Sequence, residues 1–92
     1  MWTPEARQHR LDIWDHIAAD SPVSASKLDL RFKAAAAGLS DNPQMGKPGL
    51  VRGTRELFPH PSYRLVYEHL GDAVWVLALM HTSRAWPPFD AP

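Results

Sequence analysis

The sequence predicts an α+β fold in which an N-terminal antiparallel helix hairpin packs on a small antiparallel β-sheet. Apolar residues recur at helical spacing in the first half of the chain, and short segments rich in β-branched and aromatic residues follow in the second half. A length of 92 residues is the size of one domain. We therefore expect a single domain over residues 1–92, with the hairpin at 4–39, the sheet at 50–84 and a tail at 85–92.

The start of each helix is marked by a capping residue followed by proline. Thr3 is suited to accept hydrogen bonds from the first free amides, and Pro4 fits the first helical position. Apolar residues then recur at helical spacing as far as Ala19, and the same capping signal returns at residues 21–22 after a very short break. The second amphipathic pattern ends at Leu39. Two helices joined by so short a turn form an antiparallel hairpin.

Glycine and proline interrupt the chain after the second helix, so residues 40–49 are predicted to be a loop. The strand-like segments that follow are residues 50–51, 54–58, 63–70 and 73–82. Gly71 and Asp72 suit a tight type II′ hairpin turn between the last two segments. The last segment is apolar on both faces, and we therefore expect it to be a central strand.

Composition excludes several classes of site. The formal net charge is zero, so binding of RNA or DNA would depend on a local patch rather than on the field of the whole molecule. Without cysteine there is no disulfide framework and no thiolate zinc site, and the spacing of the histidines and glycines predicts no metal and no cofactor. No apolar run approaches the roughly 20 residues that cross a bilayer, so we expect a soluble cytoplasmic protein without a membrane partner.

Basic side chains are nevertheless concentrated in the sheet half of the chain. Between residues 47 and 64, a single acidic residue, Glu56, accompanies the basic residues Lys47, Arg52, Arg55 and Arg64. One face of an antiparallel sheet covers the helices, and the other face is free to gather such groups.

If that face binds RNA, the candidate catalytic residues are Arg55, Arg64, His81 and Arg84. The arginines would hold the scissile phosphate, and His81 or Glu56 would take the proton from a ribose 2′-hydroxyl without a metal. The alternative is that the arginines are solvated or paired, as Arg55 with Glu68 or Arg64 with Glu56, and that His81 is a structural histidine at a strand end.

The candidate residues for substrate or target binding are Lys47, Arg52, Glu56, Tyr67 and Trp86. The alternative role of Lys47, which lies in a loop rich in glycine and proline, is solubility. Trp2, Trp86 and Phe89 near the two ends of the chain either cover an open edge of the core or offer a hydrophobic partner site.

Several blocks of the sequence, in the same order, resemble the RelE/ParE superfamily of bacterial toxins. The blocks are residues 2–6, 42–49, 53–57, 60–67, 74–79 and 81–87, so the resemblance covers nearly the whole chain. It implies a helix hairpin on an antiparallel sheet and the toxin half of a type II toxin–antitoxin pair. It also implies a cognate antitoxin that holds the toxin inactive. The assembly that we expect is a homodimer or a toxin–antitoxin hetero-oligomer.

Two cellular targets follow from the resemblance. Arg64 matches a catalytic arginine position of the RelE-like branch, which cleaves messenger RNA in the ribosome, and Arg55 and Arg84 match basic positions of that branch. No tyrosine follows His81, where that branch often has one, and its lysine cluster is absent. The block at 53–57 and the end of the chain look more like ParE-like members, which poison DNA gyrase. We expect ParE-like action on DNA gyrase, with a ribosome-dependent, metal-independent mRNA endoribonuclease as the alternative.

The beginning of the chain departs from the superfamily pattern. Members usually begin with a short strand, and only Met1 precedes Trp2 here. Either this strand is reduced to a residue or two or the chain has been trimmed. An exposed sheet edge would invite pairing with another chain.

Overall fold

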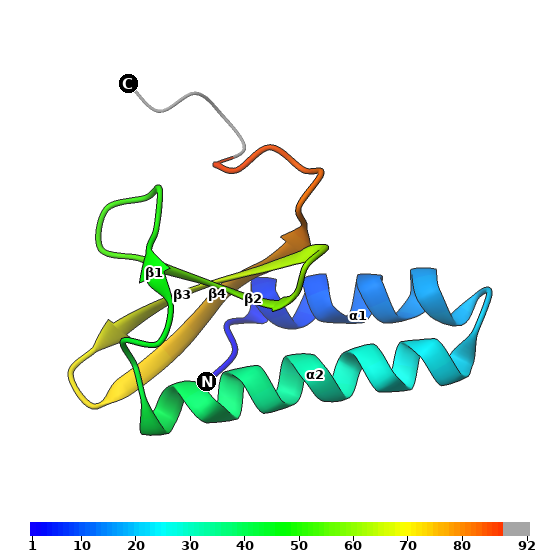
Figure 1. The fold of residues 1–92 in the computed structure, drawn as a ribbon, viewed down its shortest axis with the longest axis horizontal. Coiled ribbons are helices and arrows are strands. Elements are labelled where there is room, and N and C mark those ends of the chain that lie inside the picture. Colours follow the sequence, from blue (N-terminus) through cyan, green and yellow to red (C-terminus); the bar gives the residue numbers. More distant parts are fainter. Residues whose placement is uncertain (88–92) are drawn as a thin grey trace.

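The computed structural model describes residues 1–87, and it confirms the predicted α+β arrangement. The elements are α1 (Pro4–Ala18), α2 (Pro22–Asp41), β1 (Lys47–Pro48), β2 (Arg55–His60), β3 (Tyr63–Leu70) and β4 (Ala73–His81). The two helices run antiparallel along one side of the sheet (Figure 1). Phe89 and the rest of the predicted tail beyond Pro87 lie outside the described residues.

Both helices begin at the predicted caps. The Thr3 hydroxyl accepts a hydrogen bond from the Ala6 amide, and the Ser21 hydroxyl accepts one from the Ser24 amide, each at 3.2 Å. Proline occupies the first turn of each helix, where its missing N–H costs nothing. Helix α2 ends at Asp41, slightly beyond the predicted end, and the helix hairpin is otherwise as expected.

The start of the sheet differs from the prediction. Residues 50–51, predicted as a strand, lie in an irregular loop, and the first strand is β1, inside the segment predicted to be a loop. The Gly49 amide donates to the Thr54 carbonyl at 2.8 Å, and Gly53 adopts a φ of 83°, so residues 49–54 form a turn between β1 and β2. Strand β1 is too short to show an alternating pattern, which is why the sequence did not reveal it.

The strand order is β1-β2-β3-β4 with antiparallel neighbours, so the prediction that β4 is a central strand was wrong. Residues 1–3 lie along its outer edge instead. The Thr3 amide donates to the Val76 carbonyl at 3.0 Å, and the Val76 amide donates to the Met1 carbonyl at 2.7 Å. Trp2 thus forms a parallel bridge with Val76 at this edge. Each face of β4 carries one of two apolar clusters, so the strand is apolar on both faces although it is the last of the four.

Two apolar clusters lie on the two faces of the sheet. The helix-side cluster contains Ala6, Phe32, Leu39, Tyr63, Leu65, Tyr67, Val74, Val76 and Leu79. The opposite cluster contains Val66, Ala78 and Met80, with Trp86 packed against them. An irregularity in the β3–β4 register leaves Leu77 without a cross-strand partner, because Ala78 pairs with Val66 and Val76 pairs with Tyr67. The bulge therefore turns Ala78 away from the helices, while Val76 faces them.

Candidate functional site

The face of the sheet that points away from the helices holds an ion pair between β2 and β3. Arg64 Nε lies 3.0 Å from Glu56 Oε1, and the Glu56 side chain is only 2% exposed. The other carboxylate oxygen of Glu56 accepts a hydrogen bond from the Leu50 amide at 2.9 Å. Of the alternatives left open by the sequence, the structure adopts the pairing of Arg64 with Glu56.

The Phe58 ring lies beside this pair, and we call Lys47, Glu56, Phe58 and Arg64 together the open-face cluster. The Arg64 guanidinium carbon lies 5.7 Å from the centre of the Phe58 ring, and Lys47 Nζ lies 5.2 Å from the same ring. Such cation–π contacts favour a partly buried cation. Trp86 packs on the neighbouring apolar cluster, and its indole N–H is buried without a hydrogen-bond partner among the described residues.

Arg55 does not join this cluster. Consecutive residues of a strand point to opposite faces, so Arg55 and Glu56 lie on different sides of β2. Arg55 Nη1 donates to the Gly46 carbonyl at 2.8 Å, and no ion pair joins it to Glu68 within residues 1–87. The structure therefore does not bring Arg55 and Arg64 to one phosphate-sized site.

Tyr67, a candidate binding residue, has no exposed surface and anchors the loop before β1. Its hydroxyl donates to the Pro43 carbonyl at 2.7 Å and accepts from the Gly46 amide at 2.9 Å. A Cβ atom at Gly46 would lie 2.7 Å from the Glu56 carbonyl oxygen and 2.8 Å from the Tyr67 hydroxyl, so glycine is required there. Arg52, by contrast, is exposed in the turn between β1 and β2.

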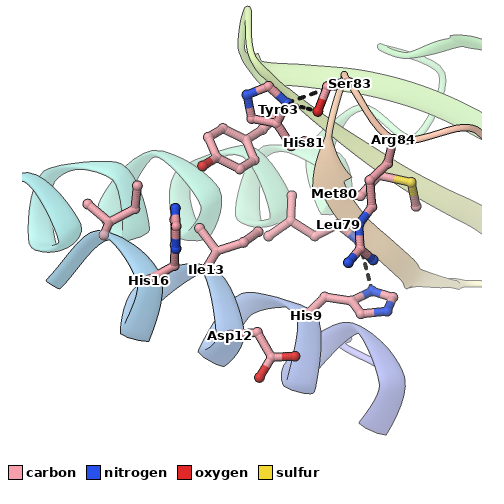
Figure 2. Close-up of a pocket in the computed structure, with 11 residues that line it drawn as sticks. His9, Asp12, Ile13, His16, Tyr63, Leu79, Met80, His81, Ser83 and Arg84 are labelled. Carbon is pink, nitrogen blue, oxygen red and sulfur yellow. Dashed lines mark hydrogen bonds between the residues drawn. The ribbon is translucent and has the colours of Figure 1, made fainter. Parts of the chain in front are cut away.

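His81 and Arg84 lie elsewhere, in a cavity of about 580 Å³ between α1 and the end of β4. His9 and His16 rise from α1 on one side of this cavity, and Tyr63 and His81 enter from the sheet on the other (Figure 2). His81 Nδ1 accepts from the Ser83 amide at 3.0 Å and lies 2.7 Å from the Ser83 hydroxyl. Because His81 Nδ1 accepts this bond from the backbone amide, the hydrogen of the neutral imidazole lies on Nε2.

A second cavity of about 410 Å³ adjoins the first and shares Ile17, Tyr63 and His81 with it. We call the two cavities together the histidine groove. The second cavity is also lined by Ser24, Lys27, Leu28, Arg31, His60 and Ser62. Apart from His60, these residues did not stand out in the sequence as site candidates, because only the tertiary fold brings α2 and the β2–β3 turn together.

Tyr63 lies at the centre of the histidine groove. Its ring packs edge-to-face between His60 and His81, with centroid distances of 6.0 Å and 5.3 Å. Burial raises the pKa of the Tyr63 hydroxyl above its ordinary value of 10.0. The hydroxyl therefore remains a hydrogen-bond donor throughout the physiological range.

Within residues 1–87, no group of three histidine, cysteine or acidic side chains is arranged to hold a metal ion. No helix in this part of the chain is both long and apolar enough to cross a membrane.

Known proteins resemble this chain over nearly its whole length. A family model described as ParE toxin of type II toxin–antitoxin system, parDE, matches residues 1–86. Toxin RelE2 of Caulobacter vibrioides is 33% identical over 85 residues, which cover 91% of this chain and 94% of that protein. A candidate toxin of Sinorhizobium fredii, Y4kP, is 29% identical over 86 residues, covering 94% and 90% respectively.

The fold also resembles a solved structure of the chromosomal ParDE toxin–antitoxin system from P. aeruginosa. The TM-score is 0.75 at 23% sequence identity, and the match covers 87% of this chain and 90% of the other. The helix hairpin and antiparallel sheet are therefore a fold seen in a ParDE system. The family model matches residues 1–86, which is nearly the whole chain. The chain belongs to the ParE toxin family of type II toxin–antitoxin systems, within the RelE/ParE superfamily.

Proposed function

We propose that this toxin arrests growth by binding DNA gyrase in the cytoplasm, and that it does not cleave RNA. The arrangement of the arginines supports the proposal. Arg64 faces a buried carboxylate, and Arg55 lies on the opposite side of the sheet. Catalysis of phosphoryl transfer depends on cations that converge on the charge developing at one phosphate. A surface without that convergence is better suited to binding a target than to cleaving one.

The turn between β1 and β2 is the surface that we assign to the target. It exposes two apolar side chains, Leu50 at 69% and Val51 at 38%, next to the exposed cation of Arg52. Lys47 and Phe58 extend this surface across the neighbouring strands. Exposed apolar side chains next to an arginine are typical of protein interfaces. Membership of a ParDE family implies a cognate antitoxin, which would control access to this surface.

Purified gyrase provides the test. We expect the toxin to inhibit supercoiling of a relaxed plasmid and to trap cleaved DNA, and we expect Arg52→Ala combined with Leu50→Ser to lose at least tenfold in potency. Lys33→Ala is the matched control, because it removes an exposed cation from α2, away from the turn. A wild-type toxin that leaves both reactions unchanged at large excess would refute the proposal.

The alternative of a metal-independent mRNA endoribonuclease has one observation in its favour. His81 and Arg84 share a cavity with the Tyr63 hydroxyl, so a base and a cation do lie in one place. Primer extension on translated messages from induced cells separates the two functions. Our proposal requires that no new 5′ ends appear. New ends that vanish in a His81→Gln chain would instead establish RNA cleavage.

A further inference from the structure

We infer that Glu56 is a positioning residue for target binding, because its buried carboxylate holds the Leu50 amide and thereby presets the conformation of the β1–β2 turn (residues 49–54). The inference deepens the proposed function and rests on it in one respect, since it takes this turn as the surface that contacts the target. The turn exposes Leu50, Val51 and Arg52. Only 2% of the Glu56 side chain is exposed, so Glu56 acts through the turn and does not touch the target itself.

The Glu56 carboxylate joins the turn to the body of the sheet. Its Oε2 accepts a hydrogen bond from the Leu50 amide at 2.9 Å, and its Oε1 lies 3.0 Å from Arg64 Nε on β3. Within residues 1–87, the other hydrogen bonds of residues 50–53 stay inside the turn. The Thr54 amide and hydroxyl both donate to the Val51 carbonyl, at 3.1 Å and 2.6 Å. The bond to Leu50 is therefore the one that ties the exposed part of the turn to the sheet.

Burial makes this carboxylate a fixed acceptor. An exposed carboxylate exchanges its partners with water, whereas a buried one depends on partners in the protein for its charge. Glu56 has such a partner in Arg64, whose side chain is itself only 17% exposed. A hydrogen bond from an amide to an ionised carboxylate is also stronger than one between neutral groups. The position of the Leu50 amide is thus set by a side chain that is held on β2 by its neighbour on β3.

Stability of the sheet does not by itself require an acid at position 56. An apolar pair of similar volume often matches or exceeds the stability that a buried ion pair provides. Such a pair could fill the space of Glu56 and Arg64, but it could not accept a hydrogen bond from the Leu50 amide. The property that distinguishes the carboxylate from an apolar side chain is therefore its hold on the turn.

A turn that is already ordered binds more tightly than one that must be ordered on binding. Leu50 and Val51 are 69% and 38% exposed, so they would bury much apolar surface against a target. Release of the Leu50 amide would leave about one residue of backbone to be fixed at the moment of binding. That cost is on the order of tenfold in affinity.

Two double variants isolate the hydrogen bond from the ion pair. Glu56→Leu with Arg64→Met removes both, whereas Glu56→Gln with Arg64→Met removes the ion pair and keeps an amide oxygen for Leu50. Each loses one acid and one base, so the net charge of the wild type is kept in both. Urea unfolding confirms that both are folded. We expect the Leu50 amide hydrogen, followed by NMR, to exchange with solvent about tenfold faster in the leucine variant than in the glutamine variant.

The wild type alone also tests the hold on the turn. Its Leu50 amide should exchange about tenfold more slowly than the Arg52 amide, after correction for the intrinsic rates, because the Arg52 amide has no acceptor within residues 1–87. Equal corrected rates for the two amides would overturn the inference without any variant.

Inhibition of gyrase supercoiling by the purified full chain measures the consequence for the target. The leucine variant should need about tenfold more toxin for half inhibition, and the glutamine variant should stay within about twofold of the wild type. Full potency of the leucine variant, with a freely exchanging Leu50 amide, overturns the inference and leaves the proposed function intact. Equal losses in both variants also overturn it, because they would assign the effect to the ion pair.

Failure of the proposed function has a different signature. If Arg52→Ala with Leu50→Ser keeps full potency, the turn is not the target surface, and the inference is overturned with it. If the wild type leaves gyrase unaffected, only the choice of gyrase fails. Growth arrest after induction, compared across the same variants at equal expression, then decides the role of Glu56, and arrest by the leucine variant as strong as by the wild type overturns it.

Discussion

Glu56 Oε1 and Arg64 Nε lie 3.0 Å apart across strands β2 and β3, on the face of the sheet away from the helices. The Glu56 side chain is 2% exposed and that of Arg64 is 17% exposed, so the carboxylate depends on Arg64 and the Leu50 amide for compensation of its charge. Arg64 therefore has a structural task in this chain, which is to compensate the buried charge of Glu56.

Arg64→Ala should destabilise the protein by about 3 kcal/mol, because it leaves a buried carboxylate without its cation. The measurement is the free energy of unfolding in urea, followed by tryptophan fluorescence. Combining Arg64→Met with Glu56→Leu should recover most of the loss, since an apolar pair of similar volume needs no compensation of charge. A loss below about 1 kcal/mol in the single variant would show that solvent compensates Glu56. Loss of toxicity in Arg64→Ala is not evidence of catalysis unless this stability effect is measured beside it.

Tyr67→Phe should cost about 2 kcal/mol, because it leaves the Gly46 amide and the Pro43 carbonyl without their shared partner. For a domain of this size the expected fall in melting temperature is about 10 °C. Differential scanning calorimetry measures it, and the control is Tyr63→Phe, which removes a hydroxyl that makes no hydrogen bond within residues 1–87. Equal melting temperatures for wild type and Tyr67→Phe would mean that the loop is held by other contacts, such as the bond from Arg55 to Gly46.

Local signals in the sequence predicted the local structure well. The caps at Thr3 and Ser21 and the glycine at the β3–β4 turn are encoded within a few residues, and the structure confirms them. The resemblance blocks also predicted the fold class correctly. By contrast, the bulge at Leu77 reverses the faces of the residues around it, and no period-2 pattern can reveal an extra residue.

The candidate sites were harder to predict because they depend on residues far apart in the sequence. Strand alternation alone separates Arg55 from its neighbour Glu56, but the partner of Arg64 depends on the β2–β3 register. The histidine groove joins α1, α2, the β2–β3 turn and the segment after β4. Of that set, His60, His81 and Arg84 stood out in the sequence, and the other residues of the groove follow from the packing of the hairpin on the sheet.

Asp29→Asn should destabilise the helix hairpin by about 1 kcal/mol. The Arg10 guanidinium binds both carboxylate oxygens of Asp29, at 2.6 Å and 2.9 Å, and it also lies 4.8 Å from the centre of the Trp2 ring. Both partners are partly exposed, at 25% and 29%, so solvent weakens the pair and the effect stays well below that of Arg64. Urea unfolding measures the change, with Asp15→Asn on the exposed face of α1 as the control. Equal losses in the two variants would contradict a specific clamp between the helices.

Alkaline pH should destabilise the protein through the Tyr63 hydroxyl. Burial raises its pKa in the folded protein above the value of 10.0, whereas the unfolded chain keeps an ordinary phenol. As pH rises through 10, the unfolded state releases this proton first, so ionisation stabilises the unfolded state and the free energy of unfolding falls until the folded pKa is passed. Below about pH 9 both states hold the proton, and the hydroxyl makes no contribution to pH dependence.

Urea unfolding at pH 8, 9, 10 and 11 measures this effect. Tyr63→Phe keeps the ring between His60 and His81 but removes the titrating group, so its stability should fall less than that of the wild type between pH 9 and 11. The remaining titratable groups are the same in both chains, and they therefore cancel in the difference. Parallel curves for the two proteins would mean that the Tyr63 hydroxyl is solvated in the folded state. The donor that we assign to the centre of the histidine groove would then ionise as readily in the folded protein as in the unfolded chain.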